Sequence, residues 1–132
     1  MDPKRVNNMA NAKKDRRKVL VIDDDSQIRN HLRISLLQCG IENISNASNA
    51  KEGMALFSKI SPDITFLDIN LPDKDGISVL SELLALDRAA SIIMLSGEST
   101  VANVKKSIAL GARGFIVKPF SMQKIIESLG AL

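Results

Sequence analysis

The sequence has no tryptophan or tyrosine, only four phenylalanines and a single cysteine, Cys39. One cysteine can form neither an internal disulfide nor a metal cluster by itself, which indicates a reducing compartment. The chain also lacks an apolar run long enough to span a membrane and the apolar core of a signal peptide. We therefore expect a cytoplasmic protein whose interior is aliphatic, with Cys39 in the core.

The 132 residues are 45% hydrophobic, which suits one globular domain, but the net charge of +3 is unevenly distributed. Residues 1–18 hold seven basic and two acidic side chains, whereas the remaining 114 residues sum to −2. We predict a flexible basic arm over residues 1–17 and a mildly acidic domain over residues 18–132. Because the arm lacks base-stacking aromatic residues, we interpret it as solvated, with nucleic-acid or membrane-surface binding as the alternative.

From Lys18 onward, short aliphatic runs alternate with longer segments of helical period. We expect strands at residues 19–22, 44–47, 64–67, 91–95 and 115–117, and helices at residues 26–38, 50–60, 77–86, 101–110 and from Ser121 onward. The second strand is polar and is placed at an edge of the sheet, and Ser99 or Thr100 is expected to cap the fourth helix. Strict alternation predicts an α/β fold with a parallel sheet covered by helices on both faces.

Polar side chains follow four of the five predicted strands, and in an open α/β sheet such positions border one crevice. They are Asp23, Asp24 and Asp25 after the first strand, then Asp68, Ser96 and Lys118. Asp25 directly precedes a helix, so we interpret it as the N-cap. The other carboxylates repel one another unless a cation shares their space, and oxygen donors suit Mg²⁺. A carboxylate nucleophile, a lysine and a hydroxyl are the groups that phosphoryl transfer needs.

Four separated segments give the chain its resemblance to a known family: VLVIDDDSQIR, DINLPDKDG, IIMLSGE and FIVKPF. From Lys18 to about Leu129, the chain resembles a response-regulator receiver domain of bacterial two-component signalling. The resemblance implies a doubly wound, flavodoxin-like sheet of five strands in the order 2-1-3-4-5. It also implies a cis peptide bond between Lys118 and Pro119, which the tertiary amide permits.

The resemblance implies that Asp68 accepts the phosphoryl group. Asp23 and Asp24 would hold Mg²⁺ together with Asp68 and the backbone carbonyl of Asn70, with Mn²⁺ as a substitute metal. This assignment makes the acidic cluster a metal centre as well as a phosphorylation site.

The same resemblance implies a switch around the phosphorylated site. Lys118 would contact the phosphoryl group, Ser96 would hydrogen-bond it in the active state, and Phe115 would be the aromatic residue that turns inward. Asn70 and Glu98 flank the site, and we expect them to tune the lifetime of the phosphorylated form.

We therefore predict a phosphorylation-dependent signalling switch that catalyses only its own phosphoryl transfer and dephosphorylation. The expected partners are a sensor histidine kinase or phosphotransfer protein and an effector that the sequence does not identify. We expect neither nucleic acid nor a membrane as a partner of this domain, and we expect a monomer or a phosphorylation-linked dimer. One alternative is a small Mg²⁺-dependent phosphatase resembling the haloacid-dehalogenase group, with Asp23 and Asp25 as its acid pair. Another is a receiver-like interaction module that never takes phosphate. His31, inside the first helix, is interpreted as a solvated or boundary residue rather than a phosphorelay histidine.

Overall fold

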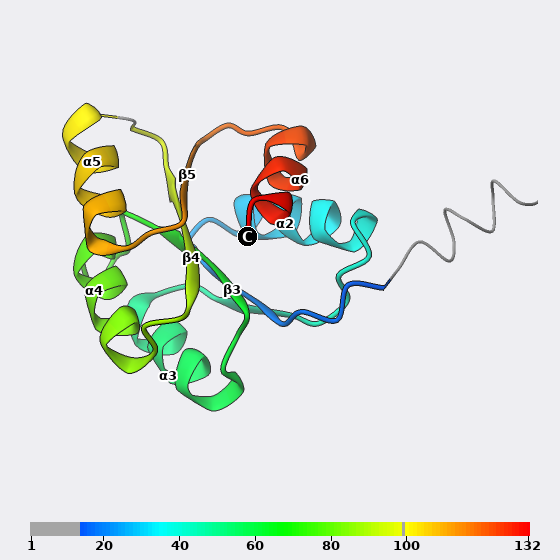
Figure 1. Cartoon of the computed structure of the whole chain (residues 1–132), viewed down its shortest axis with the longest axis horizontal. Helices are drawn as coiled ribbons and strands as arrows, with labels where there is room; N and C mark the ends of the chain where they lie inside the picture. Colours follow the sequence, from blue (N-terminus) through cyan, green and yellow to red (C-terminus); the bar gives the residue numbers. More distant parts are fainter. Residues whose placement is uncertain (1–13, 99) are drawn as a thin grey trace, which may run out of the picture.

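Strands and helices alternate strictly in the computed structural model, which describes residues 14–98 and 100–132 (Figure 1). The strands are β1 (Val19–Ile22), β2 (Ile44–Ala47), β3 (Ile64–Asp68), β4 (Ser91–Ser96) and β5 (Gly114–Val117), and the helices are α2 (Ser26–Gln38), α3 (Ala50–Ile60), α4 (Gly76–Leu86), α5 (Val101–Leu110) and α6 (Met122–Gly130). All strand pairs are parallel, in the order β2-β1-β3-β4-β5. The predicted fold class, strand order and edge position of residues 44–47 are confirmed.

Each of the described helices begins directly after a residue whose side chain accepts a hydrogen bond from a backbone N–H group of the first turn. This bond satisfies a donor that the helix itself leaves free. These caps are Asp25, Asn49, Asp75, Thr100 and Ser121. The predicted caps Asp25 and Thr100 are confirmed, while Ser99 lies outside the described residues. Ser121, predicted as the first residue of the last helix, instead precedes it as its cap.

Helices cover both faces of the sheet, with α3, α4 and α5 on one face and α2 and α6 on the other (Figure 1). Successive strand side chains point to opposite faces, so each strand contributes to two cores. Leu20, Leu67 and Met94 belong to the core beneath α3 and α4, and Val21, Phe66 and Leu95 to the core beneath α2 and α6. The central strands are therefore almost wholly apolar until they reach the crevice.

Two strands run one residue further than the sequence pattern predicts. Asp68 pairs with Leu95 at the end of β3, and Ser96 pairs with Val117 at the end of β4. Both polar residues are thus held by the sheet ladder itself rather than by a following loop. At the other elements, β5 begins at Gly114 and α4 at Gly76, each one residue earlier than predicted.

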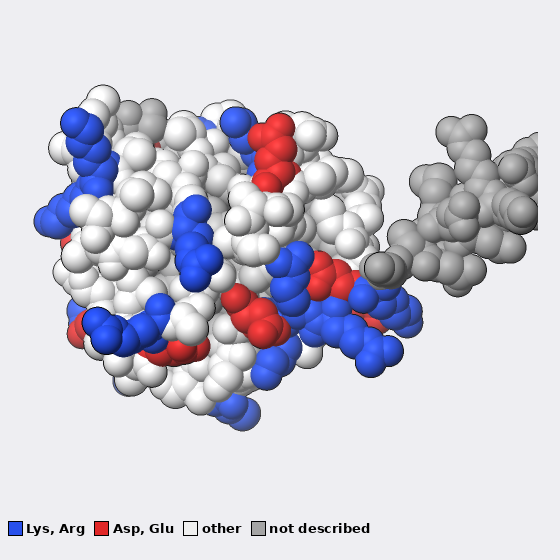
Figure 2. All heavy atoms as spheres, in the orientation of Figure 1, with Lys and Arg blue, Asp and Glu red and all other residues white. Residues whose placement is uncertain are grey.

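The contacts of the domain begin before Lys18. The Asp15 amide donates to the Gly40 carbonyl at 3.1 Å, and the Asp15 carboxylate pairs with Arg17 at 2.6 Å. Basic side chains gather beside the first described residues, with acidic side chains among them (Figure 2). Residues 1–13 of the predicted arm lie outside the described residues. Among the described helices, none combines the length and the apolar character needed to cross a bilayer.

Candidate functional site

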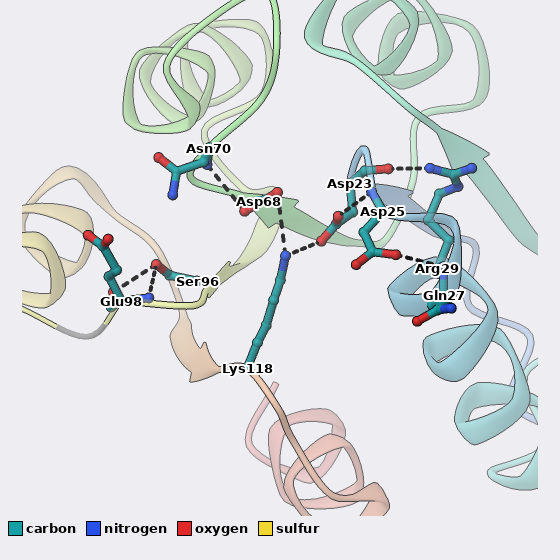
Figure 3. Close-up of polar contacts among 9 residues, drawn as sticks. All are labelled: Asp23, Asp25, Gln27, Arg29, Asp68, Asn70, Ser96, Glu98 and Lys118. Atoms are coloured by element: carbon teal, nitrogen blue, oxygen red, sulfur yellow. Dashed lines mark hydrogen bonds and ion pairs between the residues drawn. The ribbon is translucent and has the colours of Figure 1, made fainter.

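The carboxyl ends of β1, β3, β4 and β5 bring the predicted polar residues to one edge of the sheet (Figure 3). Asp23, Asp24 and Asp68 form a cluster in which one carboxylate oxygen of each lies within 4.8 Å of the others. Asp23 is fully buried and Asp68 is 4% exposed, whereas Asp24 is exposed. The cluster is therefore set into the protein but is open to solvent on the Asp24 side.

Lys118 reaches into this cluster from the segment after β5 (Figure 3). Its Nζ lies 2.6 Å from Asp23 Oδ2 and 3.4 Å from Asp68 Oδ2. Burial of the lysine disfavours its charge, but its bonds with Asp23 and Asp68 outweigh burial and raise the pKa of the ammonium group. Lys118 therefore stays charged and bridges two buried carboxylates. The predicted cis bond between Lys118 and Pro119 is present.

Asp68 has an unfavourable environment for its negative charge. Burial, followed by the neighbouring charge of Asp23, raises the pKa of Asp68 to about 6, although Lys118 and the Asn70 amide act in the opposite direction. The Asn70 amide donates to Asp68 Oδ1 at 3.2 Å. A divalent cation beside these carboxylates would favour the ionised form, which is the form that can act as a nucleophile.

Asp25 differs from its two acidic neighbours, as the sequence predicts. Its Oδ1 accepts a hydrogen bond from the Gln27 amide at 2.8 Å at the start of α2. Its own amide donates to Asp23 Oδ1 at 2.9 Å, which orients the buried carboxylate. Arg29, which the sequence pattern does not mark as a site residue, donates from Nη1 to the Asp23 carbonyl at 2.6 Å. The first turns of α2 therefore fix the backbone and the side chain of Asp23.

Ser96 is buried at the end of β4, with its hydroxyl engaged in the turn that follows. Ser96 Oγ donates to the Glu98 carbonyl at 2.7 Å and accepts from the Glu98 amide at 3.0 Å (Figure 3). Phe115 is half-buried against the core beneath α3 and α4. Asn70 and Glu98 are exposed, and they follow Asp68 and Ser96 by two residues.

The donors in the cluster fit a small, hard cation. Asp23, Asp24 and Asp68 provide only oxygen ligands, and their close approach carries a repulsion that a divalent cation removes. The number of protein ligands is small, which matches the preference of Mg²⁺ for a few carboxylates and several waters or phosphate oxygens. The acidic pocket thus has the composition of a magnesium site.

The family model described as response regulator receiver domain matches residues 19–130. Among curated relatives, the chemotaxis protein CheY of Thermotoga maritima is 34% identical over 113 residues, which cover 86% of this chain and 94% of that protein. The residues matched by the family model span the whole sheet and the acidic cluster.

Solved structures show the same similarity. A CheY-like receiver domain protein from Methanospirillum hungatei matches with a TM-score of 0.82 and 28% identity, covering 88% of this chain and 92% of that chain. CheY in the CheX-CheY-BeF3-Mg²⁺ complex of Borrelia burgdorferi matches with a TM-score of 0.82 and 31% identity, covering 85% of each chain.

Proposed function

The chain belongs to the response regulator receiver domain family, and we propose that Asp68 is the residue through which it receives a phosphoryl group. Receiver domains are phosphorylation-dependent switches of two-component signalling, and this chain has that signalling role. The observation that carries the assignment of Asp68 is its place at the end of β3, beside Asp23 and Lys118. Nucleophile, countercharge and acidic metal ligands thus meet in one pocket.

The proposed transfer is an in-line displacement at phosphorus. An oxygen of Asp68 forms a bond to phosphorus while the bond from phosphorus to the donor atom breaks, and the donor atom leaves with that electron pair. Mg²⁺, held by Asp23, Asp24, Asp68 and the Asn70 carbonyl, would supply charge neutralisation for the phosphoryl oxygens. Lys118 would bind another phosphoryl oxygen through its ammonium group, because it already lies between the two buried carboxylates.

The proposed switch requires Ser96 to change its hydrogen-bond acceptor. At present its hydroxyl proton is donated to the Glu98 carbonyl at 2.7 Å. An acyl phosphate on Asp68 would bring about −1.5 to −2 charge and strong acceptor oxygens into the same pocket, which favours donation to the phosphate instead. We propose that this exchange frees the space into which Phe115 turns, and that Asn70 and Glu98 control access of water to the acyl phosphate.

The phosphatase alternative has less support. It needs Asp23 and Asp25 as an acid pair in the crevice, but the Asp25 carboxylate caps α2 at 2.8 Å from the Gln27 amide. The hypothesis of a receiver-like module that never takes phosphate gives no role to the buried Asp68 and its raised pKa. Both alternatives are separated from the proposal by assays below.

The phosphodonor is proposed to be a sensor histidine kinase or a phosphotransfer protein. The Borrelia burgdorferi relative is in a complex with CheX, BeF3 and Mg²⁺, which supports a metal-bound state and a protein partner for the family. The monomeric or phosphorylation-linked dimeric state and the cytoplasmic location stay predictions.

Incubation with Mg²⁺ and acetyl phosphate tests the proposal. Intact-mass spectrometry should show one phosphoryl group per chain with Mg²⁺ and none with excess EDTA. A parallel assay on p-nitrophenyl phosphate should show no sustained release of nitrophenol. Continuous turnover would favour the phosphatase, and the absence of any Mg²⁺-dependent adduct would favour the module that never takes phosphate.

A further inference from the structure

His31 on α2 contacts the segment that carries Lys118, although the two are far apart in sequence. Its Nε2 lies 3.1 Å from the carbonyl oxygen of Phe120, and the two rings pack with centroids 4.8 Å apart at an interplanar angle of 33°. The helices on either side of this contact, α2 and α6, lie side by side on one face of the sheet (Figure 1). The sequence pattern gave His31 no role beyond that of a solvated or boundary residue.

The chemistry of the two groups fixes the direction of this hydrogen bond. A carbonyl oxygen only accepts, so Nε2 of His31 must carry the proton and donate it. Nε2 is therefore the donor that a test of this contact must remove or keep.

The Phe120 carbonyl depends on His31 for its hydrogen bond. Among the described residues, no backbone amide donates to this oxygen, and Phe120 is only 8% exposed. His31 supplies the hydrogen bond that this carbonyl receives among the described residues, so the bond helps to hold the segment in place. Pro119 adds stiffness between Lys118 and Phe120, because its ring fixes one backbone torsion. Fixing the Phe120 carbonyl therefore restricts where the Lys118 side chain begins.

The same helix fixes the partner of Lys118. Two residues before His31, Arg29 donates to the Asp23 carbonyl at 2.6 Å. Less than one turn of α2 thus holds the segment after β1 through Arg29 and the segment after β5 through His31. The ion pair between Lys118 Nζ and Asp23 Oδ2, at 2.6 Å, joins these two segments.

We propose that His31 is a positioning residue that holds the Lys118 ammonium group at the acidic pocket through the Phe120 carbonyl. This inference rests on the proposed function, because the group that Lys118 would bind is the phosphoryl group entering at Asp68. His31 itself touches neither the carboxylate cluster nor the phosphoryl group. A displaced Lys118 would slow the transfer without removing a metal ligand.

Two substitutions separate the hydrogen bond from the ring contact. His31→Phe keeps an aromatic ring against Phe120 but has no donor, whereas His31→Gln loses the ring but keeps an amide N–H at a similar reach. Asn30→Ala, at an exposed neighbouring position of α2, controls for general effects on the helix. For each protein, the rate of labelling by acetyl phosphate is measured across a Mg²⁺ titration, with thermal unfolding alongside.

The inference predicts that His31→Phe lowers the maximal labelling rate about fivefold to tenfold, with the half-saturating Mg²⁺ concentration unchanged within about twofold. The maximal labelling rates of His31→Gln and Asn30→Ala should lie within about twofold of the wild-type rate. Three results would overturn the inference about His31 but not the proposed function. They are a labelling rate of His31→Phe equal to that of the wild type, equally slowed labelling of His31→Phe and His31→Gln, and full recovery of the His31→Phe rate at higher Mg²⁺. A wild type that takes up no phosphoryl group would overturn the proposed function and this inference with it.

Discussion

Lys118 Nζ lies 2.6 Å from Asp23 Oδ2, and this ion pair joins the segment after β5 to the segment after β1. The lysine is further from Asp68, at 3.4 Å, so its shorter contact is with a proposed metal ligand rather than with the proposed phosphoacceptor. A cation bound by Asp23 therefore shares that carboxylate with Lys118. Three carboxylates face one lysine in this cluster, so a divalent cation would balance the remaining charge, and removal of any one member would change how the others bind.

Metal binding should depend on Asp23 but not on Asp25, although both residues follow the same strand. Asp23→Asn removes a buried carboxylate that we propose as a metal ligand, and it should weaken Mg²⁺ binding by about tenfold or more, a loss typical for groups that support a metal site. Asp25→Asn changes only the cap of α2 and should leave the affinity within about twofold of the wild type. Because the chain has no tryptophan, isothermal titration calorimetry is the suitable measurement. Equal losses in the two variants would show that the cluster is not the metal site.

The stability of the metal-free protein should fall as Asp68 ionises. Burial and Asp23 raise the Asp68 pKa from 3.8 to about 6, so the folded state keeps a proton that the unfolded chain releases between these values. The free energy of unfolding therefore decreases as the pH rises through this window. Asp68→Asn should raise the free energy of unfolding by about 1–3 kcal/mol at about pH 7.5 and change it little near pH 4. Urea unfolding in EDTA measures this free energy at each pH, and an equal effect of the substitution at the two pH values would contradict the prediction.

Gly76 and Gly97 offer a matched pair on two sides of the pocket. A Cβ on Gly76 would overlap the Asp68 carbonyl and lie 2.5 Å from Ile69 Cα, whereas a Cβ on Gly97 would meet no atom within 4 Å. Gly76→Ala should destabilise the fold by about 1–3 kcal/mol and slow labelling of Asp68, because the backbone must shift. Gly97→Ala should be neutral within about 0.5 kcal/mol. Chemical unfolding checks both variants, and similar stabilities would mean that the close approach at Gly76 is not rigid.

Asp73 connects the loop after β3 to the start of α3. Its Oδ1 accepts from the Ala50 amide at 2.8 Å and its Oδ2 from the Lys51 amide at 3.0 Å. The Ala50 amide, followed by smaller contributions that include the Lys51 amide, holds the pKa of this carboxyl below 3.8. The resulting stability is present above the unfolded pKa and is lost as the pH falls through the lower, folded value. Asp73→Ala should therefore lower the melting temperature at neutral pH, with a smaller difference in acid.

Asp87→Ala is the control for Asp73→Ala. Asp87 is also exposed and also accepts a backbone hydrogen bond, but its partner is the Ala89 amide, only two residues away. It therefore joins no separate elements, and its loss should lower the melting temperature less. Calorimetry at neutral pH compares the two variants. If Asp87→Ala lowers the melting temperature as much as Asp73→Ala does, the link between the loop and α3 adds no more stability than a local hydrogen bond.

The sequence predicts the sheet and the membership of the pocket because both depend on local patterns. Aliphatic runs mark the strands, and polar residues directly after them must lie at one edge of a parallel sheet. The cap role of Asp25 follows in the same way, since the carboxylate precedes its helix by one residue. These inferences need no knowledge of which distant residues touch.

The parts that the sequence does not predict are contacts between side chains and distant backbone groups. His31 meets a carbonyl 89 residues away, and Asp73 meets an amide 23 residues away. Carbonyl and amide groups are the same at every position, so nothing in the pattern of side chains indicates which of them a residue will reach. The turn of Ser96 toward Glu98, rather than toward Asp68, is likewise set by local torsions that composition does not specify.

The most direct test of the central claim is the position of the phosphoryl group. The wild type, Asp68→Asn and Asp75→Asn are incubated with Mg²⁺ and acetyl phosphate and analysed by intact-mass and peptide mass spectrometry. Asp75 is the matched control, because it lies in the loop that follows Asp68 but caps α4. We predict one adduct on the wild type and on Asp75→Asn, located at Asp68, and none on Asp68→Asn. An adduct of equal yield on Asp68→Asn, or its absence from the wild type, would contradict the assignment.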